Sequence, residues 1–148
     1  MKQRIKTFFA GGLLALNSFA VAVAGPLEDG DAAYHIHDYA TAMRLWRSLA
    51  EQGNAAAQFK LGTMYEFGQG VPIDYAQAVV WIRKAADAGY ASAQDNLGLM
   101  YHFGQGVPLD DARAVLWWLK AAGQGDAPGL FSSADFEGRL GIPGGENV

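Results

Sequence analysis

Apolar residues in the middle of the chain recur at the three- and four-residue spacings that place side chains on one face of a helix. Two such stripes follow one another, the first made by Ala57, Leu61, Met64 and Tyr65 and the second by Ala78, Trp81, Ile82 and Ala85. A later stripe of the same kind consists of Ala114, Trp117, Trp118 and Ala121. This helical periodicity predicts an all-α fold.

Polar caps and glycines mark where these helices begin and end. Asn54 and Asp74 stand where N-caps are expected, because a side-chain oxygen there accepts a free backbone N–H of the first turn. Between them, the Gly-Gln-Gly segment at 68–70 predicts a reversal, since glycine supplies the positive φ that a tight loop needs. Gly89 stands where a glycine commonly follows a helix. Each unit is therefore predicted to be two antiparallel helices.

The chain repeats itself with a period of 36 residues. Residues 55–90 align with residues 91–126 without a gap, and 22 of the 36 pairs are identical. Only the second half of a preceding copy is recognisable, within residues 38–53. Self-similarity with such a period is typical of a solenoid. We expect an α/α superhelical solenoid of about two and a half repeats, divided into 25–54, 55–90 and 91–126, with a C-terminal capping segment at 127–148.

One glycine inside the first helix of each unit is expected to have a steric role. Glycine at Gly62 and Gly98 costs about 1 kcal/mol relative to alanine, and this cost recurs at the same place in both units. We infer that the two helices of a pair touch there, backbone close to backbone. Trp81 and Trp117 are then expected to fill the space between neighbouring pairs.

These residues resemble the Sel-one-like repeat (SLR), a relative of the tetratricopeptide repeat. The family pattern combines a first helix AxxxLGxxYxxG, a GxGVxxD loop and a second helix AxxWxxKAAxxG. The unit at 55–90 carries this pattern with Ala57, Leu61, Gly62, Tyr65, Gly68, Gly70, Val71, Asp74, Ala78, Trp81, Lys84, Ala85, Ala86 and Gly89. The unit at 91–126 carries it with Ala93, Leu97, Gly98, Tyr101, Gly104, Gly106, Val107, Asp110, Ala114, Trp117, Lys120, Ala121, Ala122 and Gly125.

The resemblance implies a right-handed superhelix whose concave side, lined by the first helices, holds protein ligands. It implies an adaptor, like family members that act in signalling, secretion, envelope assembly and host interaction. Some exported bacterial relatives rich in cysteine have been linked to penicillin binding and β-lactam hydrolysis, but this chain has no cysteine to form their disulfides. Beyond residue 126 the motif is lost, because the places of Leu97 and Tyr101 fall on Ser133 and Glu137.

The first residues are typical of a secretory signal peptide. A basic start precedes an apolar stretch at 8–16 and small residues at 22–24. We expect a signal peptide at 1–24, cleavage before Gly25, and export to the periplasm or the medium. Cleavage after Ala22 fits the same rule, and an uncleaved membrane anchor is the alternative.

Composition narrows the classes of partner. The formal charge of the chain is −4, and removing the three basic residues of the leader leaves −7. An acidic surface repels phosphate, so nucleic acid is not an expected partner. No apolar run after the leader is long enough to span a membrane. The lack of cysteine excludes disulfides, thiol catalysis and thiolate metal sites.

No residue pattern in the chain indicates catalysis, a metal site or a cofactor. His35 and His37 would share a face only in a strand, and this stretch precedes a helix, so a zinc site is disfavoured. The Gly-Gln-Gly segments lack the preceding strand and the third glycine of a nucleotide loop. No nucleophile elbow and no metalloprotease pattern is present. We therefore expect a non-catalytic protein without metal or cofactor.

Positions that differ between repeated units are free to serve a particular ligand, whereas identical positions mainly maintain the fold. Differences on the first helices predict a protein-binding surface made of Phe59, Thr63, Glu66, Asp95, Leu99 and His102. Phe59 is the sharpest candidate, because an exposed aromatic side chain is a common interface anchor. The alternative is that these are ordinary solvated helix positions.

The last unit carries an apolar run at 115–119 that is too wide for one helix face. The segment 127–148 is expected to fold back over this run as a cap, because it contains Leu130, Phe131, Phe136, Leu140 and Ile142. The alternative leaves the run bare as a site for a partner or a second copy.

The sequence thus predicts an exported adaptor or scaffold that binds a protein or peptide along its concave first-helix face. An envelope enzyme or binder acting on peptidoglycan or β-lactams is the second hypothesis. A structural subunit that self-associates end to end, as a weak homo-oligomer, is the third, because a short array has large ends relative to its middle.

Overall fold

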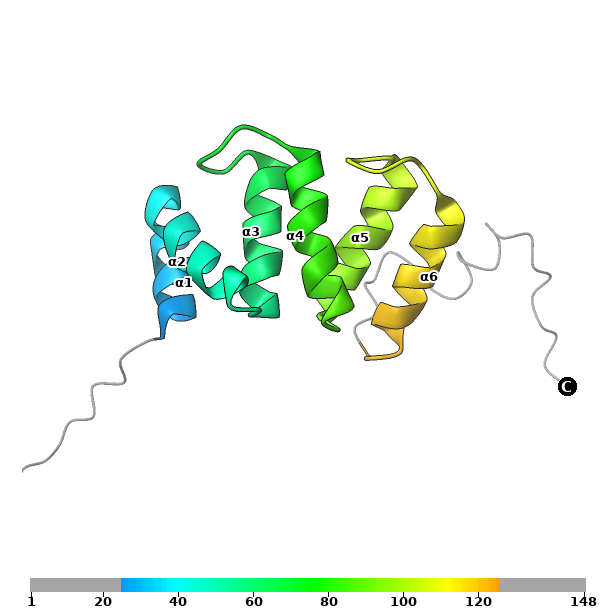
Figure 1. The fold of residues 1–148 in the computed structure, drawn as a ribbon, viewed down its shortest axis with the longest axis horizontal. Coiled ribbons are helices and arrows are strands. Elements are labelled where there is room, and N and C mark those ends of the chain that lie inside the picture. Colours follow the sequence, from blue (N-terminus) through cyan, green and yellow to red (C-terminus); the bar gives the residue numbers. More distant parts are fainter. Residues whose placement is uncertain (1–24, 126–148) are drawn as a thin grey trace, which may run out of the picture.

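The computed structural model describes residues 25–125, which form six α-helices (Figure 1). They are α1 (Pro26–His35), α2 (Tyr39–Glu51), α3 (Ala55–Phe67), α4 (Tyr75–Asp87), α5 (Ala91–Phe103) and α6 (Asp111–Ala122). Within these residues every regular element is a helix. The predicted signal peptide at 1–24 and the predicted cap at 127–148 lie outside the described residues.

Side-chain caps fix where four of the helices begin. Asp38, Asn54, Asp74 and Asp110 each accept a hydrogen bond from the backbone N–H three residues further on, at distances of 2.9 to 3.1 Å. Each bond satisfies one of the donors that the first turn of a helix leaves free. The caps predicted at Asn54 and Asp74 are confirmed.

Glycines end the first helix of the second and third pairs. Gly68 and Gly104 adopt the left-handed conformation, with φ of 67° and 66°, which is strained for residues that carry a Cβ. The loops that follow, 68–74 and 104–110, lie at the same edge of the row of helices (Figure 1). This placement gives the array a loop-bearing edge.

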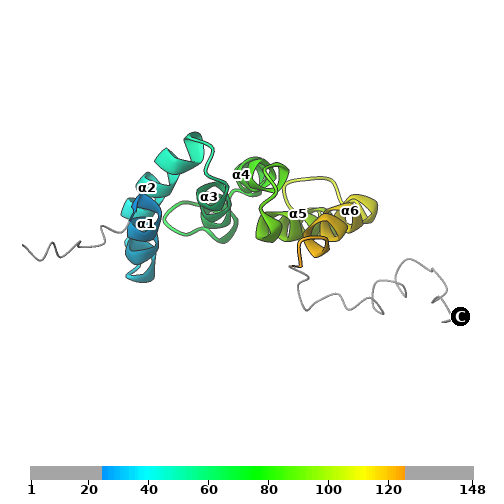
Figure 2. The same ribbon diagram turned by 90° about the horizontal axis from the view of Figure 1, so that it is seen from below.

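The extensive packing is between helices that are adjacent in sequence. Within the pairs, α1 packs on α2, α3 on α4 and α5 on α6, and between the pairs α2 packs on α3 and α4 on α5. The described helices therefore form a row rather than a closed bundle (Figures 1 and 2). The predicted all-α solenoid of helix pairs is confirmed. None of the helices in the described range is both long and apolar enough to cross a membrane.

The first pair has both of its helices, whereas the sequence comparison identified only the second. Residues 36–38 join α1 to α2, but the longer segment 68–74 joins α3 to α4. Because this connection is shorter, α1 does not lie one 36-residue period before α3. The ungapped alignment of the chain with itself therefore did not identify α1 as part of a repeat. The described part of the array therefore consists of three helix pairs.

Each pair is tight where a glycine of the first helix faces one position of the second. A side chain on the glycine would overlap with the residue opposite, and the facing pairs are Gly30 with Trp46, Gly62 with Ile82, and Gly98 with Trp118. The expected approach to backbone occurs at Gly62, where a Cβ would lie 3.2 Å from the carbonyl oxygen of Ala78. At Gly98 the neighbour is an indole, so this glycine makes room for the Trp118 side chain instead.

Two hydrophobic clusters fill the spaces between the pairs. The first cluster joins the first two pairs through buried side chains that include Trp46, Leu61, Met64 and Trp81. The second cluster joins the last two pairs through buried side chains that include Ile82, Leu97, Met100 and Trp118. Trp117, which was expected to fill a space of this kind, is only half-buried.

Candidate protein-binding site

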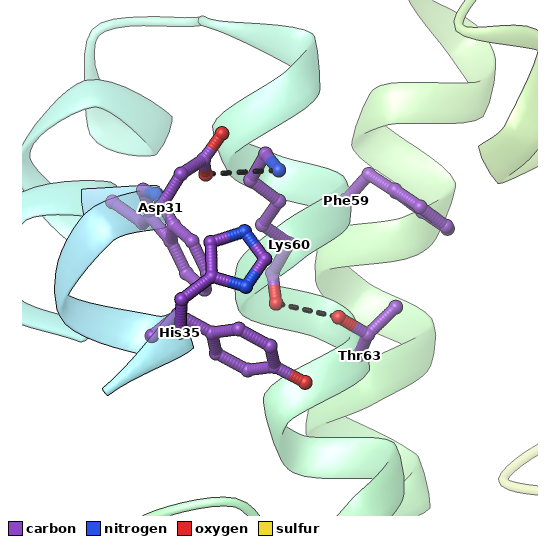
Figure 3. A pocket seen from close by; sticks show the side chains of 7 residues that line it. Asp31, His35, Phe59, Lys60 and Thr63 are labelled. Atoms are coloured by element: carbon purple, nitrogen blue, oxygen red, sulfur yellow. Dashed lines mark hydrogen bonds and ion pairs between the residues drawn. The ribbon is translucent and has the colours of Figure 1, made fainter. Parts of the chain in front are cut away.

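A pocket of about 240 Å³ opens between the first helices of the first two pairs (Figure 3). It is lined by Asp31, Tyr34 and His35 from α1, Trp46 from α2, and Phe59, Lys60 and Thr63 from α3. On α1, Tyr34 and His35 lie three and four positions after Asp31, and this spacing places them on the same side of the helix as Asp31. On α3, Thr63 has the same two spacings from Lys60 and Phe59. The pocket thus belongs to the side of the array formed by the first helices.

An ion pair joins the two helices across the pocket. Lys60 Nζ lies 2.9 Å from Asp31 Oδ1, and the two side chains are 31% and 36% exposed. The same ammonium group lies 5.3 Å from the centre of the Trp46 ring. Partly exposed pairs of this kind contribute roughly 0–1 kcal/mol to stability. The pair therefore matters mainly because it places one cation and one anion in the wall of the pocket.

Two aromatic rings of the pocket are fixed by hydrogen bonds. The Tyr34 and Trp46 rings have their centres 5.4 Å apart. Trp46 Nε1 donates to the carbonyl oxygen of Leu27 at 3.4 Å, and Gln69 Nε2 donates to the Tyr34 hydroxyl at 2.5 Å. These bonds orient both rings in the wall of the pocket.

Two of the six predicted binding residues, Phe59 and Thr63, line this pocket. The expectation that Phe59 is an exposed aromatic side chain is wrong. Its ring is half-buried, has its centre 5.4 Å from that of Tyr90, and packs against the core cluster of the last two pairs. The Thr63 hydroxyl donates to the carbonyl oxygen of Lys60 at 2.8 Å. Phe59 therefore serves both the packing between units and the wall of the pocket.

Glu66 lies at the contact between α3 and α5. Asn96 Nδ2 donates to Glu66 Oε2 at 2.8 Å. Burial raises the pKa of Glu66 above its ordinary value, and the hydrogen bond from Asn96 opposes that rise. Glu66 is thus a half-buried carboxyl whose position depends on the next unit.

The other three predicted residues lie on α5, and none of them lines the pocket. The carbonyl oxygen of Asp95 accepts a hydrogen bond from Trp118 Nε1 at 3.2 Å. His102 Nδ1 lies 2.6 Å from Asp111 Oδ1, and its ring centre is 5.8 Å from that of Trp118. Leu99 is half-buried against the second core cluster. Their contacts are made with α6 and with the core.

Sequence reasoning missed most of the pocket. Asp31, Tyr34 and His35 were overlooked because α1 falls outside the ungapped repeat alignment. A signal for Lys60 was present, since it differs from Asn96 at the equivalent place in the next unit. A comparison of all three pairs, with the short first connection allowed for, would have found this face of α1.

Metal ligands do not gather in the described part of the chain. No three His, Asp or Glu side chains between residues 25 and 125 lie close enough to hold one ion. His35 lines the pocket, whereas His37 follows the end of α1 with φ of 62° and contacts the Tyr39 hydroxyl at 2.8 Å. The two histidines are therefore engaged in different surroundings.

Known proteins share both the sequence pattern and the fold. The sequence profile of the Sel1 repeat family matches residues 23–54, 55–90 and 91–126. No curated protein sequence matches the chain significantly. A Sel1 repeat protein from Oxalobacter formigenes is similar in structure, with a TM-score of 0.64 and 39% identity, over 66% of this chain and 40% of that protein.

A second solved structure extends the likeness. It is a protective antigen present in uropathogenic Escherichia coli strains that displays an SLR fold, with a TM-score of 0.64 and 29% identity, and the match covers 79% of this chain and 28% of that one. The chain thus spans less than half the length of either structure. Sel1 repeat proteins are generally protein–protein interaction modules and typically non-enzymatic scaffolds. By its three matched repeats and its fold, the chain belongs to the Sel1 repeat family.

Proposed function

We propose that this protein is an exported, non-enzymatic interaction module that binds a protein or peptide on the face formed by its first helices. The observation that carries the proposal is the pocket between α1 and α3. Two of the positions at which the units 55–90 and 91–126 differ, Phe59 and Thr63, line it. Repeat proteins use such exchangeable positions on a fixed scaffold for ligand specificity.

The size and chemistry of the pocket favour one side chain of a polypeptide as its occupant. Small-molecule pockets usually measure about 300–1,000 Å³, whereas this one measures about 240 Å³. Its aromatic side chains suit an apolar group. The Asp31–Lys60 pair offers a donor and an acceptor to the backbone on either side of that group.

The contents of the pocket favour binding over catalysis. Its carboxylate, Asp31, is paired with Lys60. Of its two hydroxyls, that of Thr63 donates to a backbone carbonyl and that of Tyr34 accepts from Gln69. Hydrolysis of a peptidoglycan or β-lactam bond needs a nucleophile or a bound water activated by a base. The lining residues in the described structure form no hydrogen-bonded pair of that kind.

The start of α1 supports the export part of the proposal. The helix begins at Pro26 with Gly25 as its N-cap, directly after the expected cleavage position. Cleavage there leaves all of the described helices in the mature chain. The proposed destination is the periplasm or the medium.

Site-specific photocrosslinking tests the binding face in cells. A photoactivatable amino acid at Thr63, inside the pocket, is expected to give an adduct with the ligand protein. The same probe at Val80, which is exposed on α4, is the matched control. Adducts at Thr63 and none at Val80 support the proposal, whereas adducts at Val80 alone contradict the face.

A binding measurement with the crosslinked protein then tests the pocket itself. Thr63→Arg fills the pocket with a long cationic side chain, and we expect it to weaken the affinity at least tenfold, or about 1.4 kcal/mol. Val80→Arg adds the same side chain outside the pocket and should leave the affinity unchanged. Equal losses in both variants would count against the pocket.

A further inference from the structure

A row of exposed apolar side chains follows the loop-bearing edge of the array. Phe67 and Phe103, the last residues of α3 and α5, are both 62% exposed. Ile73 and Leu109, in the loops that follow these helices, are 59% and 66% exposed. Ile36, in the short connection of the first pair, is 76% exposed. We call these five residues the loop edge.

The two apolar residues of each later unit are fixed at the same helix end. The backbone N–H of Asp74 donates to the carbonyl oxygen of Tyr65 at 2.9 Å, which ties the end of the loop back to α3. Ile73 lies directly against the start of that loop, because a Cβ on Gly68 would come within 2.8 Å of its side chain. The third pair repeats both contacts one period later. The loop edge is therefore part of the folded repeat.

Packing does not explain why the phenylalanine recurs at this position. Residues that are identical between repeats normally maintain the core or the contacts between units. Phe67 and Phe103 instead leave most of their surface exposed in both units. Single exposed apolar residues are ordinary, but a row of them on a soluble protein marks an interaction surface.

Carboxylates accompany the loop edge. The second helix of each pair begins at this edge, and its N-cap is Asp38, Asp74 or Asp110. Asp111, which follows the last of these caps, adds a fourth carboxylate. Arginines offset two of these four negative charges. Arg113 forms an ion pair with Asp110 at 3.1 Å, and the charge of Arg44 attracts that of Asp38. His102 contacts Asp111 at 2.6 Å. The formal charge of this edge is therefore negative.

The sign of this charge selects the occupant. A second copy brings the same carboxylates, because the chain is acidic as a whole, and an anionic lipid surface is repelled in the same way. A ligand that carries lysine or arginine beside apolar side chains is attracted. We propose that the loop edge is a second docking surface, separate from the pocket, for a protein segment that combines apolar and basic side chains.

Synthetic peptides test the proposal on the full chain by fluorescence anisotropy. The probe alternates leucine with lysine, one control replaces lysine by glutamate, and another replaces leucine by serine. Only the leucine–lysine peptide is expected to bind. Binding of the glutamate peptide with equal affinity would overturn the charge argument, and binding of the serine peptide would overturn the apolar one.

Matched variants then locate the bound peptide. Phe67→Ser with Phe103→Ser is expected to weaken binding at least tenfold, which corresponds to about 1.4 kcal/mol. Val80→Ser with Leu116→Ser removes two other exposed apolar side chains, 46% and 59% exposed on α4 and α6, and should change nothing. Equal effects of the two double variants would overturn the assignment to the loop edge.

Charge neutralisation and self-association complete the test. Asp38→Asn with Asp74→Asn removes two charges but keeps the helix caps, since asparagine caps as well as aspartate, and should weaken binding severalfold and reduce its salt dependence. A concentration-dependent mass that is abolished by Phe67→Ser with Phe103→Ser would assign the edge to a second copy and overturn the proposal. Thr63→Arg should bind the peptide like the parent, so this surface and the pocket succeed or fail independently.

Discussion

An indole occupies the space that the missing side chain of Gly98 leaves between α5 and α6. The N–H of that indole, from Trp118, donates to the carbonyl oxygen three residues before the glycine. Trp46 makes the same bond to the carbonyl oxygen three residues before Gly30. The sequence predicts that these helices approach closely, because the glycine recurs. It does not show what fills the gap, since the occupant comes from the other helix.

Gly98→Ala is expected to destabilise the protein by about 1–3 kcal/mol, because overpacking a rigid indole forces the helices apart. Gly123→Ala is the matched control. Gly123 has φ of −62°, and a Cβ there would meet nothing closer than 3.5 Å, so alanine should be neutral or stabilise by up to about 1 kcal/mol. Urea denaturation of both variants measures the difference. A more stable Gly98→Ala protein would show that the helices separate at no cost.

Two phenylalanines of the same helix are expected to differ in their effect on stability. Phe59→Ala removes a half-buried ring that packs on Tyr90, and should cost about 1–2 kcal/mol, less than the roughly 3–5 kcal/mol of a fully buried ring. Phe67→Ala removes a ring that is 62% exposed and should stay within about 0.5 kcal/mol. Thermal melts with calorimetric enthalpies compare the two. The opposite order would mean that the faces of α3 are assigned the wrong way round.

The stability of the parent protein relative to Glu66→Gln should depend on pH. Burial raises the pKa of Glu66 above 4.5, so ionising this carboxyl costs more in the folded than in the unfolded chain. The parent therefore loses stability as the pH rises from the unfolded pKa to the raised one, while the glutamine variant loses none at this site. Urea denaturation below and above this pH interval should show that the free energy of unfolding of the glutamine variant, relative to that of the parent, increases as the pH rises. A constant difference would contradict the burial of the carboxyl.

At the level of the helices, the residues that begin and end a helix made most of the helix boundaries predictable from the sequence. Asn54 and Asp74 mark the starts of α3 and α4, and Gly68 marks the reversal between them. The helix α1 was not identified, because its connection to α2 is shorter than those of the later pairs. Most of the pocket was missed for the same reason, since three of its seven lining residues belong to α1. Local signals thus predict elements, whereas a site between elements depends on their spatial order.

Asp74→Ala should destabilise the protein by about 1 kcal/mol, because the cap of α4 is lost. Asp74→Asn should have much less effect, since the amide oxygen accepts the same N–H of Gln77. Chemical denaturation distinguishes the variants. If asparagine proves as damaging as alanine, the carboxylate charge near the helix start is the important property.

Across the whole molecule, successive units meet through a repeated set of hydrogen bonds. Arginines of the second helices donate to tyrosine hydroxyls of the next unit, Arg47 to Tyr65 at 2.7 Å and Arg83 to Tyr101 at 2.5 Å. Glutamines of the next unit donate to the end of the second helix, Gln58 to Ala50 at 3.0 Å and Gln94 to Ala86 at 3.1 Å. In the last unit of the described array Leu119, which is exposed, takes the place of the arginine. In the first unit Ala33, which is buried, takes the place of the tyrosine.

We expect the purified protein to remain monomeric, because copies stacked through this kind of contact would lack its arginine–tyrosine bond. Sedimentation over a wide range of concentrations measures the mass. A mass that rises with concentration would favour the self-associating subunit instead. Leu119→Glu would then show whether the exposed surface of α6 is responsible.

Extensive packing links each described helix to the next one along the chain, and none ties the first pair to the third. A pull on the two ends of the array would therefore be transmitted through the contacts between units one after another, not shared among them. Under load such a molecule is expected to lengthen in steps, with one helix pair released at each step. If the array holds a ligand protein, as proposed, the attachment would extend under load. The force at which it first extends would be set by the weaker of the two contacts between units.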